Sequence, residues 1–492
     1  MKILFVAAEV VPFAKTGGLA DVAGALPLAL QELGHDVCVA MPKYGRVSDA
    51  RFGLTNLLDS FPVPLDGQSG PVTVKQGFIG TDIPVYMLAN EHYFDREGIY
   101  GYEDDGERFI FFCRATLEAL KRLDWQPDII HCHDWHTGVI PNWLKTVYKS
   151  DPVLAQTASV FTIHNLQYQG IFGKRVLEIA GLEDYGFIVH PTEPALSNVI
   201  DLMARGVIFA DVITTVSERY AQEILTPEYG EKLDVILRDH QDRLFGVLNG
   251  IDVELMNPAT DKYIAVNYGF NSLDKRVENK LALQREANLP VGAEIPLLGV
   301  IGRLADQKGF DILEPAIDHI LDMDVQFILL GTGDPHYHQM FTKIAQSYPQ
   351  KAAIFLTFNA PLAQKIYAGC DLFLMPSRFE PCGLGQMIAM RYGAVPVVRA
   401  TGGLADTVHN FDARTGEGNG FTFSRYDRWA LFAAVVRALE TYRHQEVWRK
   451  LQINGMSTDF SWHKSAQRYV ELYQKALEFK RAALGSSESF IH

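Results

Sequence analysis

Two basic side chains, Arg303 and Lys308, stand five residues apart in RLADQKG, directly after the apolar run 296–302. The run has the composition of a buried strand, and a helical pattern follows the loop. Open α/β sheets bind ligands at the carboxyl ends of their strands. Arginine offers phosphate oxygens a planar fork and lysine a point charge, so this loop is a candidate clamp for a departing nucleoside diphosphate. The alternative is a pair of solvated surface cations.

An acidic residue follows a second run of this kind, 371–377. Glu380 precedes a proline in RFEPCGLGQ, which fixes its position before the next helical pattern. Its carboxylate could be a nucleophile, stabilise positive charge at a sugar carbon, or accept hydrogen bonds from sugar hydroxyls. The alternative is an ion pair with Arg378 or Lys365. No second carboxylate at the spacing of a glycosidase pair can be assigned.

The hexapeptide TGGLAD occurs twice, at 16–21 and at 401–406, each time between an expected strand and an expected helix. Glycines let the backbone approach a ligand closely, and the amino end of the helix offers unpaired N–H groups to an anion. Two such loops facing one cleft would suit a phosphorylated ligand, and plain tight turns are the alternative. Lys15 precedes only the first copy, so the two loops need not act alike.

Further polar side chains follow strand-like runs in the first half of the chain. HCHDWH occupies 131–136 after PDII, and His164-Asn165 follows FTI. A His-x-His pair at a strand end can ligate a metal, but companion ligands are not evident, and imidazoles with an indole also suit a sugar pocket. Asn249-Gly250 closes FGVL, where a simple turn and a place at the ligand site are both open.

Parallel sheets are needed to position these loops. Apolar runs of strand length alternate with helical patterns in two series, and this predicts an α/β protein with two doubly wound, Rossmann-like domains. The first series lies at 2–8, 37–41, 84–89, 128–132, 158–163, 211–216 and 244–248, and the second at 296–302, 325–331, 352–358, 371–377 and 395–400. We expect an N-terminal domain over 1–255, a crossover region over 256–294 and a C-terminal domain over 295–464.

Composition limits the partners. The 492 residues carry a formal net charge of −14, which argues against a wide nucleic-acid face or an anionic membrane surface. Apolar runs fall short of the roughly 18 residues of a membrane span. Five scattered cysteines without a CxxC pair fit a reducing cytosol, so we expect a soluble cytoplasmic protein with no nucleic-acid or membrane partner. The dinucleotide fingerprint GxGxxG is absent after the first strand, which argues against hydride transfer.

Seven segments together resemble the bacterial glycogen synthase and plant starch synthase family, in order from about residue 1 to the mid-460s. They are AAEVVPFAKTGGLADV, HDWHT, FTIHNLQYQG, VLNGID, IGRLADQKG, PSRFEPCGLGQ and TGGLADTV. The resemblance implies a GT-B fold, in which two Rossmann-like domains face across a deep cleft and a helix at about 465–485 packs back on the first domain. It also implies a retaining hexosyltransferase that moves glucose from ADP-glucose to the non-reducing-end 4-hydroxyl of an α-1,4-glucan, such as glycogen or a starch primer, with no cofactor and no metal.

By position, the resemblance implies five catalytic side chains: Lys15, His164, Arg303, Lys308 and Glu380. The three cations would bind the donor diphosphate in place of a metal, and the other two would surround the glucose. Same-face attack and double displacement both remain open as routes to retention. Further substrate contacts are expected from Gly17, Gly18, Asp21, Asp134, His136, Asn165, Tyr168, Asn249, Cys382, Gly383, Leu384, Thr401, Gly402 and Gly403.

Three other interpretations remain open. The chain could be a non-catalytic glucan-binding relative, a GT-B enzyme that uses UDP-glucose or a small acceptor, or a metal-dependent hydrolase built on the histidines. The presence of all four of Lys15, Arg303, Lys308 and Glu380 argues against the first. Neither the preference for ADP over UDP nor the oligomeric state can be read from the residues alone.

Overall fold

A computed structural model describes residues 1–488 and divides into two compact units. Unit 1 comprises 1–248 together with the chain from Trp462 onward, and unit 2 comprises Asn249–Ser461. Among the described residues, none of the helices combines the length and apolar character that a membrane span needs.

The residues expected to form a separate crossover region belong to unit 2. Helix α10 (Arg276–Glu286) packs against α13 (Ala360–Gly369). Lys280 of α10 is buried and its Nζ lies 2.7 Å from Asp371 Oδ2, beside the strand that begins at Leu372. The first boundary therefore falls at 248/249 rather than 255, because this segment completes the core of the second unit.

Unit 1 is built on a mostly parallel sheet of nine described strands in the order β11-β10-β7-β6-β1-β2-β5-β4-β3. All seven strands expected in the first series are present, with bounds shifted by a few residues. They are β1 (Lys2–Val6), β2 (Asp36–Pro42), β5 (Ile83–Ala89), β6 (Ile129–His133), β7 (Ala158–Ile163), β10 (Val212–Thr215) and β11 (Leu244–Gly246). A separate pair is formed by β8 (Ile171–Phe172) and β9 (Ile200–Asp201).

The sequence interpretation missed one long hairpin at the edge of this sheet. Strands β3 (Thr55–Leu65) and β4 (Gln68–Ile79) pair antiparallel, and β4 pairs antiparallel with β5. Asp66 and Gly67 join the two strands with φ of 51° and 68°. An Asp-Gly pair with positive φ at both positions is typical of a two-residue hairpin turn, so LDGQ was the signal that could have revealed it.

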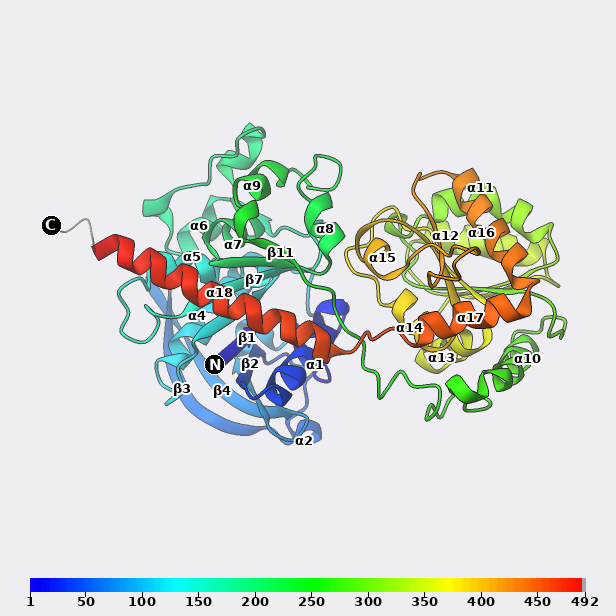
Figure 1. Ribbon diagram of the computed structural model, residues 1–492. Coiled ribbons are helices and arrows are strands. Elements are labelled where there is room, and N and C mark those ends of the chain that lie inside the picture. Colours follow the sequence, from blue (N-terminus) through cyan, green and yellow to red (C-terminus); the bar gives the residue numbers. More distant parts are fainter. Residues whose placement is uncertain (489–492) are drawn as a thin grey trace. The chain divides into compact units, whose positions relative to one another are not determined.

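Helices cover both faces of the unit 1 sheet. The 27-residue α18 (Trp462–Glu488) lies along this unit in Figure 1 and contacts β6, β7, β10 and the helix α1. Its Tyr469 and Tyr473 are fully buried, which explains why α18 belongs to unit 1. The other helices are α1 (Gly18–Glu32), α2 (Asp49–Phe52), α3 (Glu91–Phe94), α4 (Asp105–Leu120), α5 (Val139–Lys145), α6 (Lys174–Ile179), α7 (Leu202–Phe209), α8 (Glu218–Glu223) and α9 (Asp234–Asp239).

Unit 2 contains a parallel sheet in the order β14-β13-β12-β15-β16-β17. The strands are β12 (Leu297–Ile301), β13 (Gln326–Leu330), β14 (Ala352–Phe355), β15 (Leu372–Met375), β16 (Val395–Arg399) and the short β17 (Phe421–Phe423), which was not expected. Its further helices are α11 (Phe310–Leu321), α12 (Pro335–Ser347), α14 (Gly385–Arg391), α15 (Gly402–Thr407), α16 (Arg428–Tyr442) and α17 (Gln445–Met456). The predicted α/β class with two Rossmann-like sheets is confirmed.

In each sheet the strand order reverses at one point. In unit 1 the chain starts at β1, runs outward through β2, and returns to β6 on the other side of β1. In unit 2 it starts at β12, runs outward to β14, and returns to β15 on the other side of β12. Ligands of open α/β sheets bind beyond the carboxyl ends of the strands at such switch points. The loops after β1, β6, β12 and β15 are therefore the candidate site loops.

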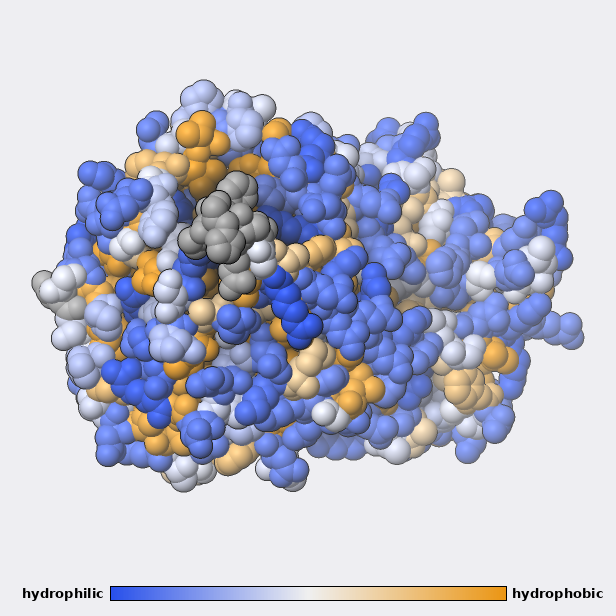
Figure 2. Space-filling model, turned by 60° about the vertical axis from the view of Figure 1, so that its left-hand side comes forward, coloured by the Kyte–Doolittle hydropathy of each residue, from blue (hydrophilic) through white to orange (hydrophobic). Residues whose placement is uncertain are grey.

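Apolar side chains lie mostly within the two units. Hydrophilic residues predominate on the face drawn in Figure 2, where apolar residues form separate patches. Large exposed apolar side chains are consequently informative. Phe358, in the loop after β14, is 87% exposed, the highest value among the large apolar side chains of the described residues.

Candidate active site

Lys308 and Glu380 are joined across the switch point of unit 2. Lys308 ends a single 3₁₀ turn, η6 (Asp306–Lys308), after β12, and Glu380 follows β15. Lys308 Nζ lies 2.7 Å from Glu380 Oε2, and Ser377 Oγ donates to the same oxygen at 3.0 Å. Glu380 is 5% exposed, whereas the Lys308 side chain is 22% exposed. The carboxylate is thus a buried anchor that holds a partly accessible ammonium.

The ion pairs considered for Glu380 from sequence are wrong. Arg378 pairs with Asp311 at 2.9 Å and Lys365 pairs with Glu286 at 2.8 Å. The true partner, Lys308, is 72 residues away in the sequence and is brought near because β12 and β15 are neighbours in the sheet.

The two loops touch through their backbones. Arg378 N donates to Gln307 O at 2.9 Å. Gly309 has φ of 74°, and a Cβ there would lie 2.0 Å from Pro376 O. Only glycine fits this approach. Arg303, at the start of the same loop, is exposed.

The second TGGLAD loop packs against the loop of Glu380. A Cβ at Gly402, whose φ is 45°, would lie 2.0 Å from Glu380 O, and one at Gly403 would lie 1.9 Å from Cys382 O. Gly403 N also donates to Glu380 O at 3.0 Å. The glycines of this copy are therefore required by the contact between two loops.

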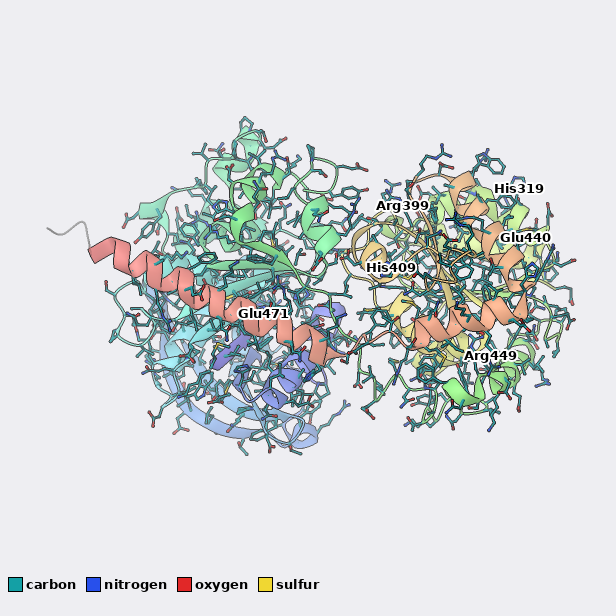
Figure 3. All side chains as sticks on the ribbon, in the orientation of Figure 1. His319, Arg399, His409, Glu440, Arg449 and Glu471 are labelled. Atoms are coloured by element: carbon teal, nitrogen blue, oxygen red, sulfur yellow. The ribbon has the colours of Figure 1, made fainter. Side chains whose placement is uncertain are left out.

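Arg399 reinforces the same contact. It ends β16 and lies beside α15 (Figure 3). Its guanidinium donates to the carbonyl oxygens of Arg378 and, at 3.2 Å, of Ser424. The loops after β15 and β16 are consequently tied together in unit 2.

The first TGGLAD loop differs from the second. A Cβ at Gly17 or Gly18 would meet none of the described atoms within 4 Å. Lys15 Nζ is bound to both carboxylate oxygens of Asp21, at 2.6 and 2.8 Å, and its side chain is 52% exposed. Helix α1 begins at Gly18 and spans 15 residues. Open space, a cation and a helix amino end therefore coincide here, as an anion site requires.

Glu9, which the sequence interpretation missed, holds this loop. It is 4% exposed and accepts hydrogen bonds from Thr16 N, from Thr16 Oγ1 at 2.7 Å and from Gly17 N at 3.2 Å. Tyr100 Oη donates to Glu9 Oε1, the oxygen that also accepts from Thr16 Oγ1, at 2.7 Å. Burial of a carboxylate without such donors would be costly. A lone Glu within the apolar segment VAAEVV was the available signal.

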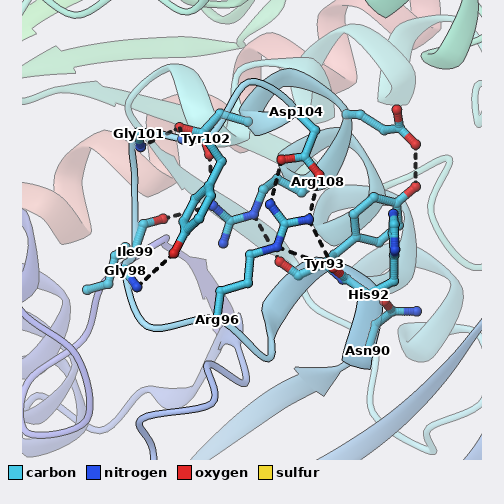
Figure 4. A network of polar contacts seen from close by, with 12 residues as sticks. Asn90, His92, Tyr93, Arg96, Gly98, Ile99, Gly101, Tyr102, Asp104 and Arg108 are labelled. Atoms are coloured by element: carbon cyan, nitrogen blue, oxygen red, sulfur yellow. Dashed lines mark hydrogen bonds and ion pairs between the residues drawn. The ribbon is translucent and has the colours of Figure 1, made fainter.

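A network in the 95–105 loop holds Tyr100 in turn (Figure 4). Arg96 binds both oxygens of Asp104 at 2.5 and 2.6 Å, and the guanidinium carbons of Arg96 and Arg108 lie 4.8 and 5.0 Å from the centroid of the Tyr102 ring. Arg108 is fully buried and donates to the carbonyl of Ile99 at 3.1 Å. The loop is thereby fixed on both sides of Tyr100.

Asp134 lies directly after β6 in an unusual backbone conformation, with φ of 56° and ψ of −178°. Residues other than glycine rarely adopt it, and such strain is concentrated at functional sites. Its Oδ1 accepts from His164 N at 2.7 Å, and it also accepts from the backbone N–H of Asn165. Burial nevertheless raises the pKa of the Asp134 carboxyl to about 7.

The neighbouring imidazoles are neutral. Burial lowers the pKa of His164 to about 3 and that of His136 to about 3. The His136 ring packs on Trp135 at 4.0 Å and on Tyr100 at 4.9 Å. Within residues 1–488, no three His, Cys, Asp or Glu side chains are grouped as a metal site would need.

The remaining predicted residues fall into the same two sets, each in its own unit. In unit 1, Asn165 begins a turn by accepting from Gln167 N at 3.0 Å, and Tyr168 is 53% exposed. In unit 2, Asn249 is buried and its backbone N–H contacts the thiol of Cys382, whose pKa burial raises to about 12. Gly383, Leu384 and Thr401 lie in the loops next to Glu380, and Thr401 is fully buried.

Two Rossmann-like units, with cations and a buried carboxylate at one switch point and a glycine turn with a lysine and histidines at the other, are the features of a glycosyltransferase of the GT-B class. Comparison with known proteins agrees. Residues 2–239 match the family described as starch synthase catalytic domain, and residues 286–454 match glycosyl transferases group 1.

Relatives match along nearly the whole chain. The glycogen synthase of Moorella thermoacetica is 51% identical over 487 residues, which is 98% of each chain, and that of Thermotoga maritima is 49% identical over 483 residues, 97% of this chain and 99% of the other. The catalytic domain of starch synthase IV from Arabidopsis thaliana, bound to ADP and acarbose, has a TM-score of 0.90 at 37% identity and covers 97% of this chain and 99% of its own. The chain therefore belongs to the glycogen synthase and starch synthase family.

Proposed function

We propose that the chain transfers glucose from ADP-glucose to the 4-hydroxyl at the non-reducing end of an α-1,4-glucan, with retention of the α configuration. The ion pair between Lys308 and Glu380 at the unit 2 switch point carries this proposal, because it fixes an ammonium where a diphosphate would lie. The ADP and acarbose bound by the Arabidopsis relative support the choice of nucleotide and of a sugar-chain acceptor.

In this reaction the bond between the anomeric carbon and the diphosphate oxygen breaks, and its electron pair leaves with ADP. The acceptor oxygen forms the new bond to that carbon, and its proton passes to the departing phosphate. Negative charge therefore grows on the diphosphate in the transition state. Lys15, Arg303 and Lys308 stabilise that charge, so the proposed reaction needs no metal or cofactor.

We assign Glu380 the role of orienting Lys308. Its Oε2 already accepts from Lys308 and Ser377, and its main-chain oxygen accepts from Gly403. Because Oε2 is engaged by both Lys308 and Ser377, the carboxylate is better suited to support the lysine than to attack the sugar. The proposal accordingly favours same-face attack over double displacement through Glu380.

Phe358 is proposed to bind the adenine base. It follows β14 at the carboxyl edge of the same sheet that carries Arg303 and Lys308. Covering an aromatic ring that is 87% exposed removes apolar surface from water, and every base has a face that can stack on it.

A cytoplasmic location is also proposed. Its support is that all five cysteines are free and buried, as expected of a chain kept in a reducing compartment.

The proposal is tested by incubating the full chain with glycogen and either ADP-glucose or UDP-glucose, with and without a chelator. The product is then digested with an α-1,4-specific hydrolase. We expect faster transfer from ADP-glucose, unaffected by chelation, and complete release of the new glucose by the hydrolase. A preference for UDP-glucose would overturn the donor, and binding of glycogen without transfer from either donor would show a glucan-binding protein instead.

A further inference from the structure

His164 is held at its ring as well as at its backbone. Its Nε2 lies 3.0 Å from His133 Nδ1, while its backbone N–H is bound by Asp134 at 2.7 Å. His133 is the last residue of β6 and is fully buried. One of these two ring nitrogens must carry the hydrogen that joins them.

Both rings are neutral, so each carries a single N–H. Burial lowers the pKa of His133 well below its usual value, and that of His164 to about 3. Each ring must therefore place its one hydrogen on either Nδ1 or Nε2, and the contact between them couples the two choices.

The surroundings of His133 decide which way the hydrogen points. His133 Nε2 is buried and has no hydrogen-bond partner among the described residues. If Nε2 carried the hydrogen, a buried N–H would be left unpaired, which proteins avoid more strictly than an unpaired acceptor. The hydrogen of His133 therefore belongs on Nδ1, where it is donated to His164.

Packing prevents the His133 ring from turning to another arrangement. The rings of His131 and Phe5 lie against it, with centroids 4.2 and 5.3 Å away. His131 is itself bound at both nitrogens, by Tyr473 Oη at 2.8 Å and by Thr162 Oγ1 at 2.6 Å. The stack thus runs from helix α18 to His164 within unit 1.

We propose that His133 is a positioning residue that fixes His164 in the tautomer with its hydrogen on Nδ1. Since Nε2 of His164 accepts from His133, the Nδ1–H is left to donate to the bound sugar. This consequence rests on the proposed function, whereas the tautomer itself does not. Free imidazole side chains favour the opposite tautomer, so the arrangement must be imposed by the protein.

The test uses the full chain labelled with ¹⁵N-histidine, without substrate. Nitrogen chemical shifts report which ring nitrogen carries the hydrogen, and the His164 signals are assigned by their loss in His164→Gln. Three further proteins are compared. His133→Leu removes the donor, His133→Asn offers an amide N–H near the position of Nδ1, and His319→Leu is the matched control on the exposed surface of α11 (Figure 3).

We expect His164 of the wild type and of His319→Leu to carry its hydrogen on Nδ1. In His133→Leu the hydrogen should move to Nε2 and kcat should fall about tenfold at a KM for ADP-glucose changed less than twofold. His133→Asn should restore the wild-type tautomer and most of kcat. Recovery by Asn but not Leu is not expected of a role in packing alone.

A hydrogen on Nε2 of His164 in the wild type would overturn the proposal, and so would an unchanged tautomer in His133→Leu. If His133→Leu does not fold, the tautomers of His164 in the wild type and in His133→Asn still test the proposal. Failure of the wild type to transfer glucose would overturn the proposed function but leave the tautomer result intact, so the two failures are distinguishable.

Discussion

Lys308 Nζ lies 2.7 Å from Glu380 Oε2, and this ion pair joins the loops that follow β12 and β15. These strands are neighbours at the point where the order of the unit 2 sheet reverses. The carboxylate is buried and the ammonium is partly accessible. In this pair, Glu380 is therefore the buried support and Lys308 is the charged group that a ligand can reach.

Replacing Glu380 by Gln tests whether its charge supports Lys308. The amide keeps the size of the side chain but loses the charge that holds Lys308, so kcat should fall about 10²-fold while KM for ADP-glucose changes little. Steady-state kinetics and a thermal unfolding curve measure the two effects. Wild-type kcat in Glu380→Gln would show that the carboxylate charge is not needed.

The two identical TGGLAD loops should respond differently to the same substitution. Gly403→Ala places a Cβ against Cys382 O, so it should lower the free energy of unfolding by about 2–4 kcal/mol. The Cβ of Gly17→Ala would lie in open space, so this substitution should change the free energy of unfolding by less than about 0.5 kcal/mol. It should nevertheless raise KM for ADP-glucose. Urea unfolding and KM for ADP-glucose separate these outcomes. Equal losses of stability would contradict the account.

Phe358→Ala should raise KM for ADP-glucose about tenfold, since stacking of a base on an aromatic ring contributes about 1–3 kcal/mol. The melting temperature should not change, because the side chain is 87% exposed. Phe358→Tyr serves as the control and should behave like the wild type. An unchanged KM in Phe358→Ala would place the base elsewhere.

The raised pKa of Asp134 predicts that the free energy of unfolding depends on pH. Its pKa of about 7 in the folded chain exceeds the usual value near 4, so the folded state holds the proton more tightly than the unfolded state. Stability should therefore be lost as pH rises from about 4 to about 7, by up to about 4 kcal/mol.

Asp134→Asn cannot ionise at this position. Its free energy of unfolding, compared with that of the wild type, should thus improve steadily between pH 4 and pH 7 and level off above. Urea unfolding at several pH values provides the measurement. A difference between the two proteins that is independent of pH would show that Asp134 ionises normally.

The sheets could be predicted from the sequence because buried parallel strands are continuous apolar runs, such as 297–301 and 327–330. The β3 and β4 hairpin was harder to see, because its strands alternate exposed and buried side chains at one edge. The strand ends located the site loops, including those of Arg303, Glu380 and His164. The local sequence pattern was therefore sufficient to locate these loops.

Partners across the fold could not be predicted, because they depend on which strands are neighbours. The pairing of Glu380 with Lys308 joins residues 72 positions apart, whose contact only the folded chain creates, whereas the support of Gly17 by Glu9 lies within one loop. Identical hexapeptides also gave no sign that Gly403 packs against Cys382 while Gly17 faces open space. The sequence identifies both TGGLAD loops, but the role of each loop depends on the residues that pack around it.

Fixed cations are proposed to stabilise the departing ADP, and Lys308→Met tests this most directly. Methionine keeps the length and apolar stem of the side chain but removes its charge. With ADP-glucose and glycogen as substrates, we expect kcat to fall by about 10²–10³-fold, with an unchanged melting temperature and a KM within a few-fold of the wild type. A kcat within threefold of the wild type would contradict the account.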